Sequence, residues 1–209
     1  ITKELATLTY PLYFYDYETI SGPVPLLDHT GPWQQVVAQY SLHKIAADGT
    51  ISHHEWLLDS WVTHNKSLLE KMIQDMDGAN NGTYIVWYKG FENSRNNERA
   101  VIYPEYAEQL QYINDHTFDL MELFSKQLYF HRDFHWSSSI KKVLPVLTDI
   151  SYDGLQVPNW AVAMDILTRM VSGQYEWMEL EAHRANLLEY CKQDTWAMVR
   201  IWEEVKEKI

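Results

Sequence analysis

The sequence predicts an α/β domain with a mixed central sheet, and the order of its strand-like and helix-like segments carries this prediction. Three strand-like segments come first, a helix-like segment follows, and a short apolar strand comes next. The remaining chain has mostly helical periodicity. We therefore expect three strands in an antiparallel meander, a fourth strand parallel to the first, and helices that flank the sheet.

The predicted strands are rich in aromatic and β-branched residues, and they cover 9–18, 34–45, 51–59 and 83–88. A loop rich in proline and glycine at 21–33 separates the first two strands, and Asp48-Gly49 predicts a tight turn before the third. Apolar residues at helical spacing predict helices at 65–76, 91–102, 104–115, 118–129, 139–147, 159–172 and 180–207.

Length and charge limit the possible classes of function. The 209 residues suit one domain, and the formal net charge of −12 disfavours a protein that coats nucleic acid through a broad basic face. The same charge is compatible with a metal-dependent enzyme that acts on phosphates, because such a site is acidic until its metals bind.

The first residue and the cysteine content indicate whether the chain is a fragment and in which cellular compartment it lies. The chain begins with Ile1, which suggests a fragment of a longer protein, and Cys191 is its single cysteine. One cysteine excludes an internal disulfide and favours a reducing compartment. No run of eighteen apolar residues occurs, so we expect no membrane span and a cytoplasmic location.

Two carboxylates stand in the middle of the first predicted strand, in the stretch YFYDYETI at 13–20. Side chains two residues apart in a strand face the same side, so Asp16 and Glu18 should point to one face. Burial of both without a partner would be costly. They therefore need a cation or an open end of the strand, although a solvent-facing acidic pair would show the same pattern.

Two later segments offer further acidic residues. Tyr190 and Asp194 stand four residues apart in EYCKQDTWAMVRIW, so they share one face of a predicted helix. An ordinary amphipathic helix with one polar residue would look the same. Glu92 follows a glycine turn after the apolar strand in IVWYKGFEN, and the alternative there is a glutamate favoured by the dipole at a helix start.

Together and in this order, the three motifs resemble those of the DEDD exonucleases of the ribonuclease H-like superfamily, and the tyrosine is similar to that of the DEDDy branch. The resemblance spans about residues 9–205. More narrowly, five stretches look like one bacterial domain family of that superfamily, whose members often follow a RecB-like nuclease domain. These stretches are YFYDYETISGPVP, QYSLHKI, VWYKGFENSR, SSSIKKVLPVL and LLEYCKQDTWAMV.

The resemblance implies a ribonuclease H-like fold and a 3′–5′ exonuclease that cleaves single-stranded DNA or RNA to nucleoside monophosphates with two Mg²⁺ or Mn²⁺ ions. Asp16 would bridge the two metals, and Glu18 and Asp194 would complete the tighter site. Glu92 would hold the second metal, and Tyr190 would orient the attacking water. Hard oxygen ligands of this kind suit both ions.

Several secondary residues are weaker candidates. Asp119, after Phe118, is a possible further metal ligand, or only an acid near a helix start. The polar stretch HRDFHWSSSIKKVL at 131–144 offers cations for a phosphate backbone and a serine, Ser138 or Ser139, that can cap a helix. A mobile surface loop would look the same. The predicted nucleic-acid contacts are Lys89, Arg132, Trp136, Lys141 and Lys142.

Two other functions remain open at this point. Glu92 and Lys89 depart from the aspartate and asparagine of the common pattern, so the domain could be a binding module for nucleic acid or a partner domain. A structure-selective endonuclease of the same superfamily is the other alternative. Zinc is disfavoured, because the histidines form no H-E-x-x-H pattern, and the adjacent His53 and His54 should point to opposite faces of a strand.

Overall fold

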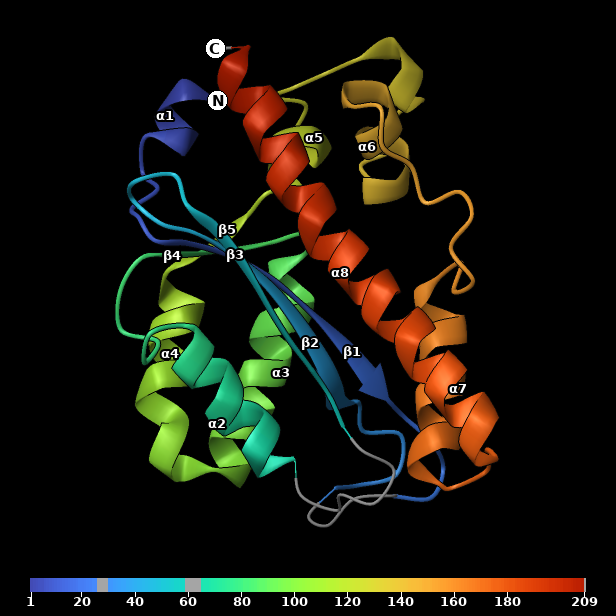
Figure 1. Cartoon of the computed structure of the whole chain (residues 1–209). Coiled ribbons are helices and arrows are strands. Elements are labelled where there is room, and N and C mark those ends of the chain that lie inside the picture. The colour runs from blue at the N-terminus through green and yellow to red at the C-terminus, as the bar shows by residue number, and fades with distance from the viewer. Residues whose placement is uncertain (26–29, 59–64, 209) are drawn as a thin grey trace.

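The computed structural model describes residues 1–25, 30–58 and 65–208, and it shows an α/β domain with helices on both faces of a mixed sheet (Figure 1). The strand order is β3-β2-β1-β4-β5. The β1–β2 and β2–β3 pairs are antiparallel, whereas β1–β4 and β4–β5 are parallel. This confirms the meander and the parallel fourth strand. The strands are β1 (Leu12–Ile20), β2 (Val36–Ile45), β3 (Ile51–Leu57), β4 (Thr83–Val86) and β5 (Thr117–Asp119).

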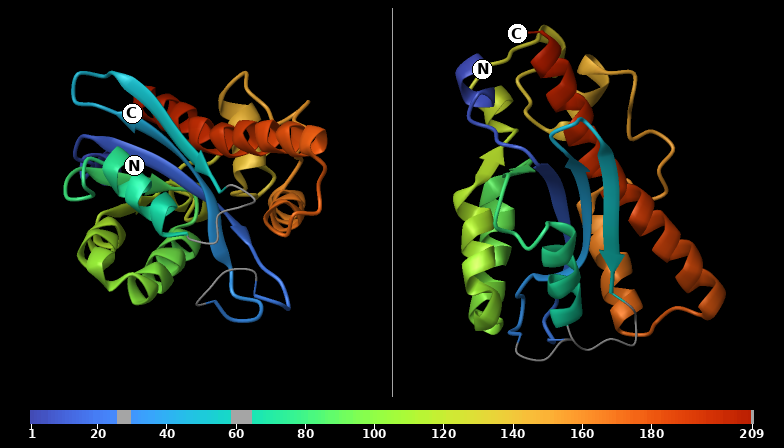
Figure 2. Two further views of the ribbon diagram at one scale, coloured as in Figure 1. Left: turned by 60° about the horizontal axis from the view of Figure 1, so that its bottom comes forward. Right: turned by 60° about the vertical axis from the view of Figure 1, so that its left-hand side comes forward.

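The helices form two layers around the sheet. Helices α2, α3 and α4 lie on one side of it, and α6, α7 and α8 lie on the other (Figure 2). A short 3₁₀ turn, Pro104–Tyr106, leads into α4. The helices are α1 (Thr2–Leu5), α2 (Lys66–Asp75), α3 (Lys89–Ile102), α4 (Ala107–Asp115), α5 (Glu122–Ser125), α6 (Ile140–Leu147), α7 (Trp160–Val171) and α8 (Trp177–Glu207).

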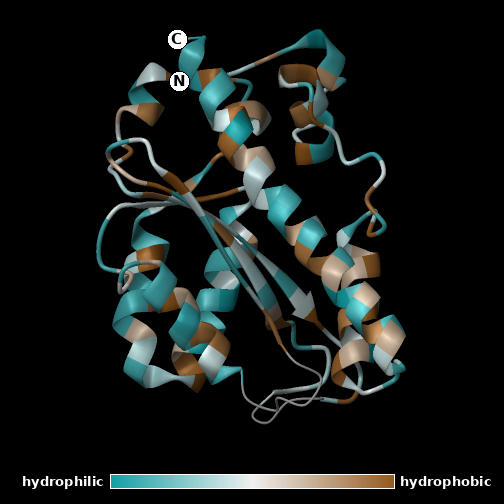
Figure 3. Cartoon of the chain, in the orientation of Figure 1, coloured by the Kyte–Doolittle hydropathy of each residue, from teal (hydrophilic) through white to brown (hydrophobic). Residues whose placement is uncertain are grey.

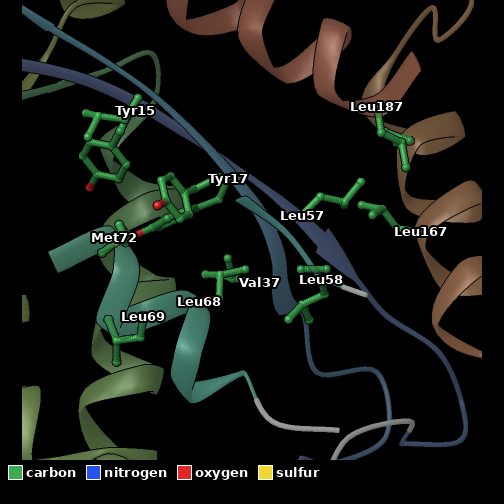
Figure 4. Close-up of a cluster of buried hydrophobic side chains, with 14 of the residues drawn as sticks. Tyr15, Tyr17, Val37, Leu57, Leu58, Leu68, Leu69, Met72, Leu167 and Leu187 are labelled. Atoms are coloured by element: carbon green, nitrogen blue, oxygen red, sulfur yellow. The ribbon is translucent and has the colours of Figure 1, made fainter. Parts of the chain in front are cut away.

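The central strand β1 is buried on both faces, which explains its aromatic run. Tyr15 and Tyr17 point toward α2, where the Tyr17 hydroxyl lies 3.0 Å from the Met72 sulfur (Figure 4). On the opposite face, Phe14 packs edge-on against Trp202 of α8, with 5.8 Å between ring centroids. Asp16 is the next residue along β1 on this α8 face, so the apolar packing gives way to acid there.

The helices carry apolar residues toward the sheet and polar residues away from it. Figure 3 shows hydrophobic and hydrophilic residues alternating around the helices of both layers. Among the described residues, no helix is both long enough and apolar enough to cross a membrane. The layers are therefore those of an ordinary α/β core, with the sheet between them.

The structure corrects the prediction of a helix over 118–129. The chain instead forms the short edge strand β5, three residues long, and then the single-turn helix α5. β5 exists because Phe118 pairs with Ile85 of β4, a long-range contact that a local helical pattern does not reveal.

Other boundaries differ less, and one predicted cap is not made. α3 begins at Lys89 and α8 at Trp177, each slightly earlier than predicted. Ser139 does precede α6, but its side chain makes no capping hydrogen bond. Parts of the predicted loop at 21–33 and of the strand at 51–59 lie outside the described residues.

Candidate active site

A cavity of about 760 Å³ opens beside β1 where that strand runs on past its parallel neighbour. The β1–β4 pairing ends at Phe14 and Ile85, so the chain after β4 turns away and enters α3. The carboxyl end of β1 therefore faces the first turn of α3 on one side and α8 on the other. The acidic half of β1 lines the space between them.

Five residues predicted from three distant motifs line this one cavity. They are Asp16 and Glu18 of β1, Glu92 of α3, and Tyr190 and Asp194 of α8. The strand fixes the first two on one face, and the four-residue helical spacing fixes the last two on one face. The structure thus brings together groups that are up to 178 positions apart, from Asp16 to Asp194.

The four carboxylates line one cavity, where burial and neighbouring acids make their ionised forms costly. Burial, and after it the charge of Asp194, raises the pKa of both Asp16 and Glu18 well above their ordinary values. Burial also raises the pKa of Glu92 to about 8. For Asp194, burial raises the pKa to about 6, although hydrogen bonds and the Lys141 charge pull it down.

Among these four acids, Glu92 is the one with a buried carboxylate oxygen that lacks a hydrogen-bond partner among the described residues. Its side chain is 3% exposed, and the oxygen in question is Oε2. A buried carboxylate oxygen without a donor costs free energy that a bound cation would recover. Glu92 thus supports a cation site in this cavity.

Lys141 lines the cavity beside Glu18 and Asp194. Its Nζ lies 3.4 Å from the Tyr190 hydroxyl and donates to the Pro158 carbonyl oxygen at 2.5 Å. Its charge lowers the pKa of both Glu18 and Asp194, opposing the effect of burial. Of the basic residues that the sequence proposed for a phosphate, Lys141 is the one that the structure places at the cavity.

Cys191 also belongs to the site, although the sequence analysis used it only to exclude an internal disulfide. Its thiol lies 3.8 Å from Oδ2 of Asp16. The Cys191 sulfur and one carboxylate oxygen each from Asp16 and Glu18 lie within 4.8 Å of one another. Its place three residues before Asp194, on the same helix face, is the signal that could have found it.

Asp119 lies at the carboxyl end of β5, next to the start of α3. Its two carboxylate oxygens accept backbone N–H bonds from Lys89 at 3.0 Å and from Met121 at 3.1 Å. Its charge contributes to the raised pKa of Glu92. Asp119 is therefore a neighbour of the acidic cluster, but it is not among the described residues that line the cavity.

An aromatic wall also lines the cavity. It consists of Trp87, Tyr88 and Phe91, which follow β4, and Trp160, the first residue of α7. Trp160 is 62% exposed, so its ring is open to a ligand. None of these four is among the nucleic-acid contacts predicted from the sequence, which named Trp136 as the aromatic contact.

Four predicted nucleic-acid contacts lie elsewhere. Lys89, Arg132, Trp136 and Lys142 are exposed and are not among the described residues that line the cavity. Trp136 is 80% exposed and packs against Phe130, with ring centroids 5.2 Å apart. His53 and His54 do point to opposite faces, since His53 bonds Ser41 and His54 lies 3.5 Å from Asp75.

Comparison with known proteins places the chain in a family. It is 29% identical to an uncharacterised protein of Mycoplasma pneumoniae, the MG366 homolog, over 94% of this chain and 32% of that protein. It is 26% identical to protein MG366 of Mycoplasma genitalium, over 90% of this chain and 31% of that protein. The chain therefore spans about a third of the length of these relatives. No solved structure matches it.

A family profile matches residues 13–139, which include the acidic half of β1, the start of α3 and the segment before α6. The match covers more than half of the chain, and the family is described as a domain of unknown function, DUF2779. On this match, the chain is a member of the DUF2779 family.

Proposed function

We propose that this domain is a two-metal-ion 3′–5′ exonuclease of the DEDDy kind, with a ribonuclease H-like fold, acting on single-stranded DNA or RNA. One observation carries the proposal. Four carboxylates and a tyrosine, from the three motifs that resemble those of the exonucleases, line a single cavity. The mixed sheet, with its antiparallel meander and parallel fourth strand, agrees with the fold that the resemblance implies.

The residues present fit a pair of divalent cations. The orphaned Oε2 of Glu92, and the pKa values of Asp16 and Glu18 that burial and then neighbouring acids raise, mark buried acidic groups that a cation would stabilise. Asp16, Glu18 and Asp194 would hold one ion, and Asp16 and Glu92 would hold the other. Bound Mg²⁺ or Mn²⁺ would supply Lewis-acid stabilisation of the charge that develops on the phosphate oxygens.

The chain's own groups have separate tasks. Tyr190, whose hydroxyl lies among the acids, would orient the water that attacks the phosphorus atom. Lys141 would hold a non-bridging phosphate oxygen through its ammonium group. The aromatic wall would accept an unstacked base, which a single-stranded end can present without breaking base pairs.

Two departures from the exonuclease pattern bear on the binding-module alternative. Glu92 is one methylene longer than aspartate, yet it reaches the cavity. The ammonium group of Lys89 lies 4.0 Å from Glu122, so its charge is paired away from the acids rather than placed among them. Both observations favour a working site. The resemblance also leads us to expect a RecB-like nuclease domain upstream in the longer protein.

The test of this function is cleavage of 5′-labelled single-stranded DNA and RNA with Mn²⁺, Mg²⁺ or EDTA. We expect a metal-dependent ladder that shortens from the 3′ end and is absent in Asp194→Asn. Asp165→Asn, which makes the same change at an exposed carboxylate of α7, is the matched control and should cleave normally.

Circular single-stranded DNA separates the alternatives, because an exonuclease needs an end. Cleavage of the circle would favour the endonuclease. No cleavage of any substrate, with no heat released on titration of Mn²⁺, would leave the binding module as the better reading.

Removal of the most exposed ring of the aromatic wall, that of Trp160, should weaken substrate binding. We expect Trp160→Ala to reduce the affinity for a short single-stranded oligonucleotide by roughly 1–3 kcal/mol, the value of one base–aromatic stack. Fluorescence anisotropy in EDTA, where no cleavage occurs, measures it directly. Trp136→Ala is the control, since that ring is also exposed but is not among the described residues that line the cavity. A larger loss in Trp136→Ala would place the nucleic acid on the segment before α6 instead.

A further inference from the structure

The irregular segment between α6 and α7 sends one side chain into the acidic cluster. The Tyr152 hydroxyl donates a hydrogen bond of 2.6 Å to Oδ1 of Asp194, across 42 positions of the chain. This contact joins a segment without helix or strand to the middle of the long helix α8. None of the three sequence motifs contains Tyr152.

The same tyrosine also borders the cation of the site. The Lys141 ammonium group lies between two rings, 5.0 Å from the centroid of Tyr152 and 4.9 Å from that of Tyr190. Its bond to the Pro158 carbonyl oxygen ties α6 to the same segment. Tyr152, Lys141, Tyr190 and Asp194 therefore form one interlocked group, in which each ring or charge limits the movement of its neighbour.

The geometry fixes what Tyr152 can contribute. A carboxylate on a helix can rotate about its side-chain bonds, and a hydrogen bond to one oxygen restricts that rotation while the second oxygen stays available. The donor is a neutral phenol, so it orients Asp194 without neutralising its charge, as a competing lysine or arginine would. Groups that orient metal ligands in this way typically change metal affinity by about 10–100-fold when they are removed.

We propose that Tyr152 is a positioning residue of this site, which holds the Asp194 carboxylate in the orientation that binds the metal and holds Lys141 at the cavity. The inference rests on the proposed function, because it assigns to Tyr152 a role toward the same divalent ion. It extends the site beyond the three motifs to the segment between α6 and α7.

The test is Tyr152→Phe, which keeps the ring against Lys141 and removes only the hydroxyl. Calorimetric titration of the protein with Mn²⁺, without substrate, should show affinity about 10–100-fold weaker than in the wild type. Tyr40→Phe is a closely matched control, because the buried Tyr40 hydroxyl donates to Asp75 at the same 2.6 Å, away from the cavity. Tyr40→Phe should bind Mn²⁺ as the wild type does, whatever it loses in thermal stability.

Three results would overturn the inference, and they are distinguishable. Unchanged Mn²⁺ affinity in Tyr152→Phe would refute the role of Tyr152 while leaving the proposed function intact. Equal weakening in both variants would show a general loss of stability rather than positioning. Absence of Mn²⁺ binding in the wild type would refute the proposed metal-dependent function, and the role of Tyr152 with it.

Discussion

Replacement of Asp16 by asparagine is expected to reduce the rate of nucleotide release by about 10³-fold or more, which corresponds to about 4 kcal/mol in the activation barrier. Asparagine has nearly the same shape, so the packing of β1 is retained. The substitution removes the carboxylate whose pKa is raised, after burial, by the charges of Asp194, Glu18 and Glu92. The measurement is the initial rate on a 5′-labelled single strand with saturating Mn²⁺, together with calorimetric titration of the ion.

The same variant should become more stable as its activity disappears. Without metal, the wild-type site buries an acidic group at Asp16 beside other acids, and asparagine removes both the cost of burying that group and its repulsion by the others. We therefore expect Asp16→Asn to unfold at a higher temperature than the wild type in EDTA at pH 8. Asp165→Asn, at an exposed carboxylate, should alter neither the rate nor the melting temperature appreciably. A variant that is inactive and also less stable would mean that Asp16 supports the fold rather than the chemistry.

The sequence could predict the sheet where the pattern was local. The aromatic run of β1, the Asp48-Gly49 turn and the apolar residues of β4 each carry their own signal, and the crossover through α2 makes β4 parallel to β1. β5 carried no such signal. Its three residues are a strand only because Phe118 lies beside Ile85, and the helical spacing around them predicted the wrong element.

The residues of the candidate site also fall into two groups, those that local spacing predicts and those that only the packing of the fold brings in. Asp16 with Glu18, and Tyr190 with Asp194, could be found because spacing within one element sets a common face. Tyr152 and Trp160 could not, because they enter the site from an irregular segment and from a helix start, whose positions depend on the packing of α6 and α7. The basic, polar composition of 131–144 predicts that these side chains are exposed, but it does not predict which of them lie at the cavity. In the structure Lys141 lines the cavity, whereas Arg132 is exposed and is not among the described residues that line it.

Above pH 7 the metal-free protein is expected to lose stability as the pH rises. Glu92 has a pKa of about 8 in the folded protein against an ordinary value of 4.5, so the folded state holds a proton that the unfolded state has released. The proton on Glu92 stabilises the folded state fully when the pH lies below 4.5, the ordinary pKa of glutamate. This stabilisation is lost as the pH rises through about 8, the pKa in the folded protein. Between pH 7 and 8.5, Glu92 alone accounts for roughly 1 kcal/mol.

The pKa values of other acids and of two histidines decide the pH range in which the unfolding free energy is best measured. Asp16 and Glu18, with pKa values also raised by burial, act in the same direction as Glu92. Burial lowers the pKa of His43 to about 3 and of His53 to about 4, and these two oppose the trend mainly below about pH 6.5, the ordinary value for histidine. Chemical denaturation at pH 7 and at pH 8.5 therefore avoids the histidine contribution, and Glu92→Gln should show a smaller fall.

Bound Mn²⁺ should flatten this dependence, because the metal-bound folded state, like the unfolded state above pH 7, holds these carboxylates deprotonated. At about 100 times its dissociation constant, an ion that binds only the folded state adds about 2.7 kcal/mol. The unfolding free energy should therefore be higher with Mn²⁺ than without it, and its fall between pH 7 and pH 8.5 should nearly disappear. A fall of equal size with and without Mn²⁺ would mean that the carboxylates with raised pKa values do not hold the ion, because they would then still keep their protons in the folded state.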